Sequence, residues 1–163
     1  SADPTDCATR ALPLHAAGRQ LAAGAAQPGL SGGRTGLSAR FADATLAYQG
    51  YGAGVALEPL RALAAISTDG LQPDLTIVLD VPVEAGLARK PPGDVTRFEA
   101  EFDVAFHRRV RQGFLALAEA DPARVKVVDA MPPSADVGTA VNAIVDRLIG
   151  SSEPNPVAMR ITS

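Results

Sequence analysis

The sequence predicts an α/β fold with a parallel sheet, and three observations support this. The run Leu75–Leu79 is short, almost continuously apolar and rich in branched residues, which is typical of a strand covered on both faces, as in a parallel sheet. A second run, Val125–Asp129, also reads as a strand. Around them lie stretches in which apolar residues recur every three or four positions, the period of an amphipathic helix. Strands and helices therefore alternate, as in α/β domains.

Composition limits the possible functions. The chain has 163 residues, enough for one domain, and a net charge of −3 without a basic cluster, which argues against nucleic acid or an anionic membrane as partners. Cys7 is the only cysteine, so no internal disulfide forms and a reducing cytoplasm is the expected location. No apolar run reaches membrane-spanning length and no signal peptide is visible, so we expect a soluble protein.

The first 38 residues carry little structural information. Glycines and prolines interrupt them, and no period of 2 or 3.6 is sustained. We expect at most one short helix, around His15–Ala26, and no strand before Ala39. The expected organisation is a diverged or non-homologous segment over 1–38, an α/β domain over 39–149 and a flexible tail over 150–163.

Regular elements begin after residue 40. Asp43 is a plausible N-cap for a helix that ends at Gly50. A second helix is expected over Leu57–Ile66, burying Leu60, Leu63, Ala64 and Ile66, followed by a turn at Asp69-Gly70.

The first strand ends at Asp80, a position where open α/β sheets place ligand-binding groups, although a turn or cap residue is the plainer interpretation. A helix over Val83–Ala88 follows. The segment Arg89–Val95 then forms a cationic connection, and Thr96 with Glu99 fits a capping box.

The next helix has the clearest apolar stripe, which indicates a core or a subunit interface: Phe98, Phe102, Phe106, Val110, Phe114 and Leu117. Asp121-Pro122 ends this helix. After the second strand, a final helix begins with Ser134 as N-cap and is expected to bury Val137, Val141, Ile144, Val145 and Leu148.

The most informative stretch for function is Arg40–Gly54. Its helical spacing sets Thr45, Tyr48 and Gln49 on one side of a turn, next to the fixed charge of Arg40. A guanidinium suits a phosphate, a tyrosine suits a sugar or ring, and a carboxamide suits a base edge. The glycines at 50, 52 and 54 are expected to end the helix and let the backbone approach a ligand.

This stretch resembles the signature of bacterial thymidylate kinases, in particular through Tyr48-Gln49-Gly50-Tyr51-Gly52. The resemblance continues through Asp69–Asp80, Gly86–Arg89 and Arg97-Phe98-Glu99. It implies a P-loop NTPase-like nucleoside monophosphate kinase fold, with three α/β/α layers and a parallel sheet, incomplete at the N-terminus.

The resemblance also implies a reaction, ATP + dTMP giving ADP + dTDP for dTTP biosynthesis, with Mg²⁺ as the required ion and a homodimer as the assembly. By this resemblance Arg40, Thr45, Tyr48 and Gln49 bind dTMP. Arg89 and Arg97 match lid residues that bring cations to the ATP phosphates and are the candidate catalytic residues. Ala44 stands in place of the usual serine.

The part of the family site that binds ATP is not recognisable. A P-loop needs Gly-x-x-x-x-Gly-Lys-Ser/Thr, but the only lysines are Lys90 and Lys126, and neither follows a glycine. Gly29–Thr35 imitates the composition and is interpreted as a loop, and Ala39 replaces the aspartate associated with magnesium. No metal site is predicted. We expect a kinase that is impaired or inactive alone; the alternative is a non-catalytic protein that binds dTMP or dimerises.

Overall fold

The computed structural model describes residues 19–20, 22–89 and 103–150. Its helices and strands in chain order are η1 (Ala22–Ala26), α2 (Gln27–Ser31), α3 (Ala42–Thr45), η2 (Leu46–Gly52), α4 (Leu57–Thr68), β1 (Thr76–Asp80), α5 (Val83–Ala88), α7 (Val104–Ala120), β2 (Val125–Asp129) and α8 (Ser134–Gly150). The two η segments are π-helices, with wider turns than an α-helix.

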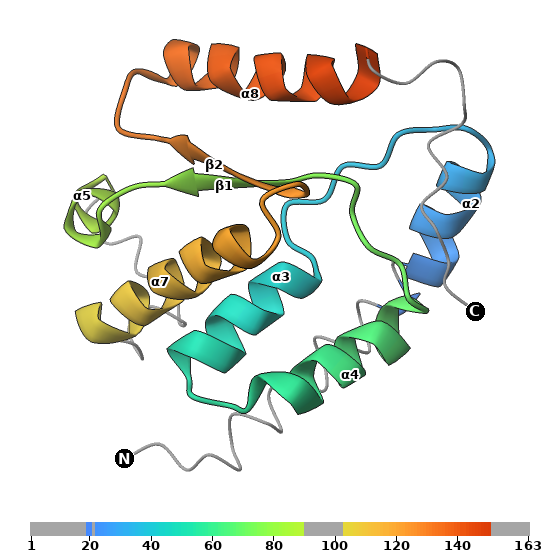
Figure 1. The fold of residues 1–163 in the computed structure, drawn as a ribbon, viewed down its shortest axis with the longest axis horizontal. Helices are drawn as coiled ribbons and strands as arrows, with labels where there is room; N and C mark the ends of the chain where they lie inside the picture. Colours follow the sequence, from blue (N-terminus) through green and yellow to red (C-terminus); the bar gives the residue numbers. More distant parts are fainter. Residues whose placement is uncertain (1–18, 21, 90–102, 151–163) are drawn as a thin grey trace.

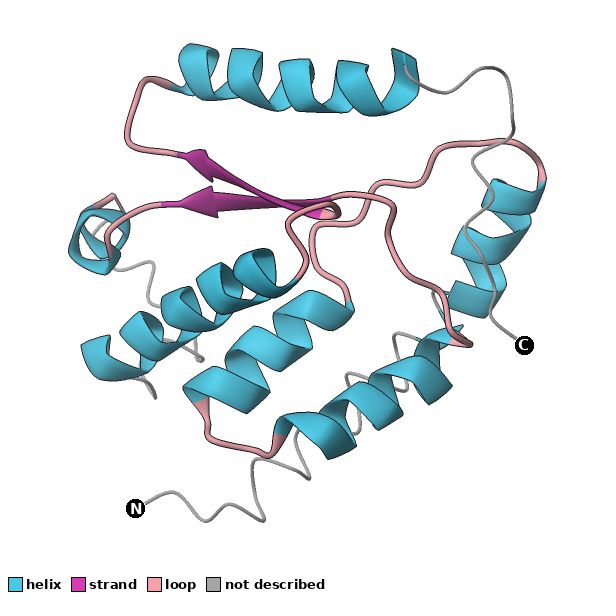
Figure 2. Cartoon of the chain, viewed as in Figure 1, coloured by secondary structure: helices cyan, strands magenta, loops and turns pink. Residues whose placement is uncertain are grey.

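The fold is α/β, with helices on both faces of a parallel sheet. Among the described residues the sheet has two strands, β1 and β2, whose register runs from Thr76 opposite Val125 to Asp80 opposite Asp129. Helix α8 covers one face, while α7 and α3 lie on the other (Figure 1). Helix α4 packs against α3 and η2, farther from the sheet (Figure 2).

The main cluster of buried apolar residues lies between α3–η2, α4 and α7, and β2 adds the buried Val125 and Val128. The buried members of the main cluster are Leu46, Ala47, Leu60, Phe106, Val110 and Leu117. Phe114, on the same stripe of α7, is half-buried and packs against this cluster. The stripe predicted for this helix is therefore confirmed for its described part. Phe98, Phe102 and the capping box from Thr96 to Glu99 lie outside the described residues.

Several predicted boundaries are confirmed. Helix α5 and strand β2 have the expected ranges, and α7 ends at Ala120, just before Asp121-Pro122. The turn after α4 is also present, with Asp69 and Gly70 both in the left-handed region at φ 57° and 72°. These boundaries depend on residues close together in the sequence, which explains why they could be predicted.

The helix at residue 43 differs from its prediction. Asp43 is not the N-cap: Phe41 holds that position without a side-chain bond, and Asp43 is buried in the first turn of α3. Gly50 does not end the helix, because α3 continues as η2 to Gly52. Gly54, at φ 81°, then takes the chain out of the helix.

Burial was overestimated in three elements, α4, β1 and α8. Ile66 is 69% exposed and does not join Leu60 and Ala64 on the buried side of α4. Strand β1 is not covered on both faces, since Leu79 is 55% exposed, and Leu148 of α8 is 39% exposed. No residue of α8 is fully buried, because among the described elements it packs chiefly against β2.

The region before residue 40 also differs from its prediction. Helical turns run through Ala22–Ala26 and Gln27–Ser31, past the expected end at Ala26. Gly29–Thr35 is therefore not simply a loop: it begins as the last turn of α2, and Gly32 and Gly33 form the turn that follows. None of the described helices is long and apolar enough to cross a membrane.

Candidate functional site

Arg40, two positions before α3, contacts Tyr48 of η2. The guanidinium carbon of Arg40 is 4.8 Å from the centre of the Tyr48 ring, and Nη2 donates to Tyr48 Oη at 3.4 Å. Arg40 is exposed, and Tyr48 is its only hydrogen-bonded side-chain partner among the described residues. The cation is therefore oriented by the ring.

Tyr48 is also held in place by α7. Its ring centre lies 6.3 Å from that of Phe106 and 6.2 Å from that of Phe114, in tilted and edge-on contacts. The wider turn of η2 carries Tyr48 toward α7, so the α-helical spacing that placed it beside Thr45 and Gln49 does not apply directly. π-Helical segments occur frequently at functional sites.

Thr45 and Gln49 are half-buried on the same segment. Within the described part of the chain, neither side chain has a hydrogen-bond partner. Thr45, Tyr48 and Gln49 thus lie on α3–η2 and Arg40 lies two positions before α3, and among these four the structure shows a contact between Arg40 and Tyr48.

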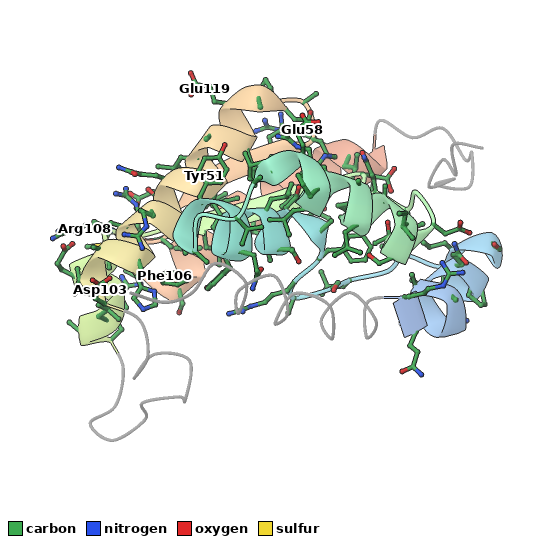
Figure 3. The ribbon with its side chains drawn as sticks, turned by 90° about the horizontal axis from the view of Figure 1, so that it is seen from below. Tyr51, Glu58, Asp103, Phe106, Arg108 and Glu119 are labelled. Atoms are coloured by element: carbon green, nitrogen blue, oxygen red, sulfur yellow. The ribbon has the colours of Figure 1, made fainter. Side chains whose placement is uncertain are left out.

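The glycines of the motif make contacts that differ from those expected. A Cβ at Gly52 would lie 2.7 Å from side-chain atoms of both Phe106 and Val110, and one at Gly50 would collide with Leu57. Their close approach is therefore to α7 and α4, not to a ligand. Figure 3 shows Tyr51 and Phe106 along the contact between η2 and α7. Arg109 of α7 completes this contact by donating from Nε to the Gly52 carbonyl at 3.0 Å.

A buried ion pair that the sequence did not indicate ties α3 to the sheet. Arg124 Nη1 and Nη2 donate to the two oxygens of Asp43 at 2.7 and 3.0 Å, and its Nε donates to Asp121 at 2.8 Å. Thr76 Oγ1 donates to Asp43 Oδ2 at 2.7 Å. The hydrogen bond to Asp43 raises the pKa of Arg124, and that from Arg124 lowers the pKa of Asp121. We call Asp43, Thr76, Asp121 and Arg124 the Arg124 network.

Asp80 stands at the carboxyl end of β1, as expected, but it is neither a turn residue nor a helix cap. Arg111 of α7 donates Nε and Nη2 to its two oxygens at 2.7 and 2.8 Å. This bidentate contact lowers the pKa of Asp80 below its ordinary value of 3.8. Asp80 therefore joins β1 to α7.

Arg89 lies at the same edge of the sheet. It donates to the carbonyls of Ala130 at 2.9 Å and Met131 at 3.3 Å, in the loop between β2 and α8. Ala130 N in turn donates to the Asp80 carbonyl at 2.8 Å. Arg97, the other candidate from the lid, lies outside the described residues.

The described residues do not offer a recognisable site for magnesium or the triphosphate of ATP. Within residues 22–89 and 103–150, no group of three or more His, Cys, Asp or Glu side chains could hold a metal ion. Gly29–Thr35 runs from a helix into a turn, the reverse of the loop that opens a helix in a phosphate cradle.

Comparison with known proteins assigns the family. The thymidylate kinase family model matches residues 4–141. The chain belongs to the thymidylate kinase family. The match begins upstream of the boundary at residue 39 that the motifs suggested, and the division of the chain at 38 and 149 stays a prediction.

Individual relatives agree with this assignment. Thymidylate kinase of Desulfovibrio desulfuricans is 47% identical over 119 residues, which cover 68% of this chain and 54% of that protein. Thymidylate kinase of Desulforudis audaxviator is 43% identical over 141 residues, covering 86% and 63%. The chain thus spans a little over half of these relatives.

A solved structure is also similar. The crystal structure of thymidylate kinase from Ehrlichia chaffeensis has a TM-score of 0.66 and 26% identity to this chain, covering 85% of it and 64% of the solved chain. The nucleoside monophosphate kinase fold inferred from the motifs is confirmed by this likeness.

Proposed function

We propose that this chain supplies the dTMP-binding side of a thymidylate kinase, which transfers the γ-phosphoryl group of ATP to the phosphate of dTMP. The observation that carries the proposal is the Arg40–Tyr48 contact, with the half-buried side chains of Thr45 and Gln49, which have no hydrogen-bond partner among the described residues, on the same segment. Family membership supports it from an independent direction.

Each side chain has a role that matches its chemistry. The exposed guanidinium of Arg40 suits two parallel hydrogen bonds to a phosphate. Tyr48 offers a ring face and a hydroxyl to the nucleoside, while Gln49 provides both a donor and an acceptor for a pyrimidine edge. Thr45 adds a hydroxyl. Phosphoryl transfer depends mainly on positioning and charge neutralisation, so holding the acceptor phosphate is a substantial part of catalysis.

The other parts of the proposal rest on the family resemblance alone. They are the use of ATP and Mg²⁺, a cytoplasmic location, a homodimer, and a role for Arg89 and Arg97 on the donor side. For Arg89, that role requires exchanging two neutral carbonyl acceptors for charged phosphate oxygens, which accept stronger hydrogen bonds.

Removing the Arg40 guanidinium tests the acceptor site. Arg40→Ala should weaken dTMP binding by about tenfold or more, the effect of losing hydrogen bonds to a charged group, while the free energy of unfolding changes little because Arg40 is exposed. Calorimetric titration measures the affinity, and thermal shift measures stability with and without dTMP.

Arg61→Ala is the matched control, since Arg61 is an exposed arginine of α4 outside the proposed site. It should bind dTMP as the wild type does. Equal affinity in Arg40→Ala and Arg61→Ala would remove the assignment of the site to Arg40 and Tyr48.

A further inference from the structure

The α3–η2 segment is held at two separate places. On its apolar side Tyr48 packs between Phe106 and Phe114 of α7. At its polar end Asp43 binds Arg124 and Thr76, which are 81 and 33 positions away in the sequence. The two contacts therefore fix the segment against α7 and the sheet at once.

The polar contact controls orientation as well as distance. Asp43 is 8% exposed, and its carboxylate accepts two N–H groups of one planar guanidinium and the Thr76 hydroxyl. Arg124 is fixed in turn by Asp121 at the end of α7. A bidentate pair of this kind restricts the angle between its partners, which a single hydrogen bond does not.

Tyr48 contacts the Arg40 guanidinium, but few contacts fix the backbone of Arg40, which therefore depends on this restraint. Residues 31–40 are exposed and, apart from Ser31 at the end of α2, lie outside regular structure. The Ser38 hydroxyl donates to the Arg40 carbonyl and Tyr48 contacts the guanidinium. Asp43 follows Arg40 by three positions, so a rotation of α3 displaces the guanidinium directly.

We propose that Asp43, Thr76 and Arg124 are positioning residues that orient Arg40 toward the phosphate of the nucleotide. This inference rests on the proposed function and deepens it. The phosphate contact is directional and depends on the network, whereas Tyr48 keeps its own support on α7. Loss of the network should therefore weaken recognition of the phosphate more than recognition of the nucleoside.

The test compares dTMP with thymidine, which lacks the phosphate, by calorimetric titration. Asp43→Asn keeps the shape of the side chain and removes its charge. Glu84→Gln is the matched control, because Glu84 forms an exposed ion pair with Arg108 outside the site. Asp43→Asn should reduce the preference for dTMP over thymidine by about tenfold, the value of one charge-assisted hydrogen bond, and Glu84→Gln should leave it unchanged.

Thr76→Val provides a milder variant should Asp43→Asn fail to fold. It leaves the ion pair intact and removes one hydroxyl, so the preference should fall in the same direction by a smaller factor. If the affinities for dTMP and thymidine fell by equal factors in these variants, the network would have a structural role only and the proposal would be overturned.

Amide hydrogen exchange separates this inference from the proposed function. Absence of dTMP binding by the wild-type chain would remove the proposed function and the phosphate-orienting role with it. Exchange over residues 42–52 still decides whether the network holds the segment. Faster exchange in Asp43→Asn than in Glu84→Gln supports the anchoring, and equal exchange overturns it.

Discussion

At the scale of single residues, ion pairs connect elements that are distant in the sequence. Arg111 holds Asp80 across 31 positions, and Arg124 holds Asp43 across 81. The side chains of the first pair are 39% and 20% exposed, and those of the second 19% and 11%. Solvent therefore screens the Asp80 pair more than the Asp43 pair, and the two should contribute differently to stability.

The Asp80 pair predicts a specific pH dependence. Because its folded-state pKa lies below 3.8, the pair contributes fully to stability above about pH 4, and this contribution is lost as the pH falls through the folded value. Asp80→Asn should lower the free energy of unfolding by about 1 kcal/mol at pH 7, after allowance for solvent screening. The difference from the wild type should shrink below about pH 4.

Urea denaturation at several pH values measures this difference. Arg111→Gln, which removes the same pair from the other side, should show the same pH dependence. A difference that stays constant down to about pH 2 would mean that the pair does not stabilise the folded state.

At the scale of elements, α7 organises the fold. It packs against η2, contacts β2 and α5, and carries both Arg109 and Arg111. Asp103 begins this helix by accepting a hydrogen bond from Phe106 N at 2.7 Å. Gly113 lies at its crossing with η2, where a Cβ would be 2.7 Å from Tyr51 Cβ.

Removing the cap of α7 should cost measurable stability. Asp103→Ala is expected to lower the free energy of unfolding by about 1 kcal/mol, because a backbone N–H of the first turn loses its acceptor. Asp103→Asn keeps an acceptor oxygen and should stay within about 0.5 kcal/mol of the wild type. Chemical denaturation distinguishes the two; equal losses would show that charge, not capping, is responsible.

Replacement by alanine should have opposite effects on stability at two helical glycines, one in α8 and one at the crossing of α7 and η2. Gly138→Ala in α8 meets no atom within 4 Å and should gain about 0.5–1 kcal/mol from helix propensity. Gly113→Ala should instead lose stability, since overpacking costs about 1–3 kcal/mol and Tyr51 Cβ cannot move without its backbone. Thermal and urea unfolding measure both. A gain in stability in both variants would indicate that α7 and η2 can separate to accommodate the added methyl group.

At the scale of the whole molecule, the buried core and the candidate site share the same helices. Phe106 is 4% exposed and contacts both Tyr48 and the position of Gly52. Its loss affects both stability and the placement of Tyr48. Phe106→Ala should lower the free energy of unfolding by about 3–5 kcal/mol, whereas Val104→Ala, at a position 40% exposed, should change it by less than about 1 kcal/mol.

Denaturation midpoints test this comparison. Similar losses for Phe106→Ala and Val104→Ala would contradict the placement of the core between η2, α4 and α7. Because Phe106 supports Tyr48, the folded fraction of the Phe106 variant should also bind dTMP more weakly than the wild type.

Much of the secondary structure followed from local patterns. The stripe on α7, the turn at Asp69-Gly70 and the ranges of α5 and β2 depend on residues within a few positions of one another. The grouping of Arg40 with Tyr48 was predicted in the same way. The same reasoning failed at Asp43, whose acidic side chain before an apolar run is typical of an N-cap but binds Arg124 instead.

By itself, the sequence determined the α/β class, the family and the residues proposed to bind the nucleotide, because periodicity, turn residues and a short motif are properties of neighbouring positions. The tertiary structure decided which acid pairs with which arginine and that η2 is π-helical. It also decided that Gly50 and Gly52 allow close packing against α4 and α7. These outcomes depend on contacts between residues tens of positions apart, and local spacing carries no information about such partners.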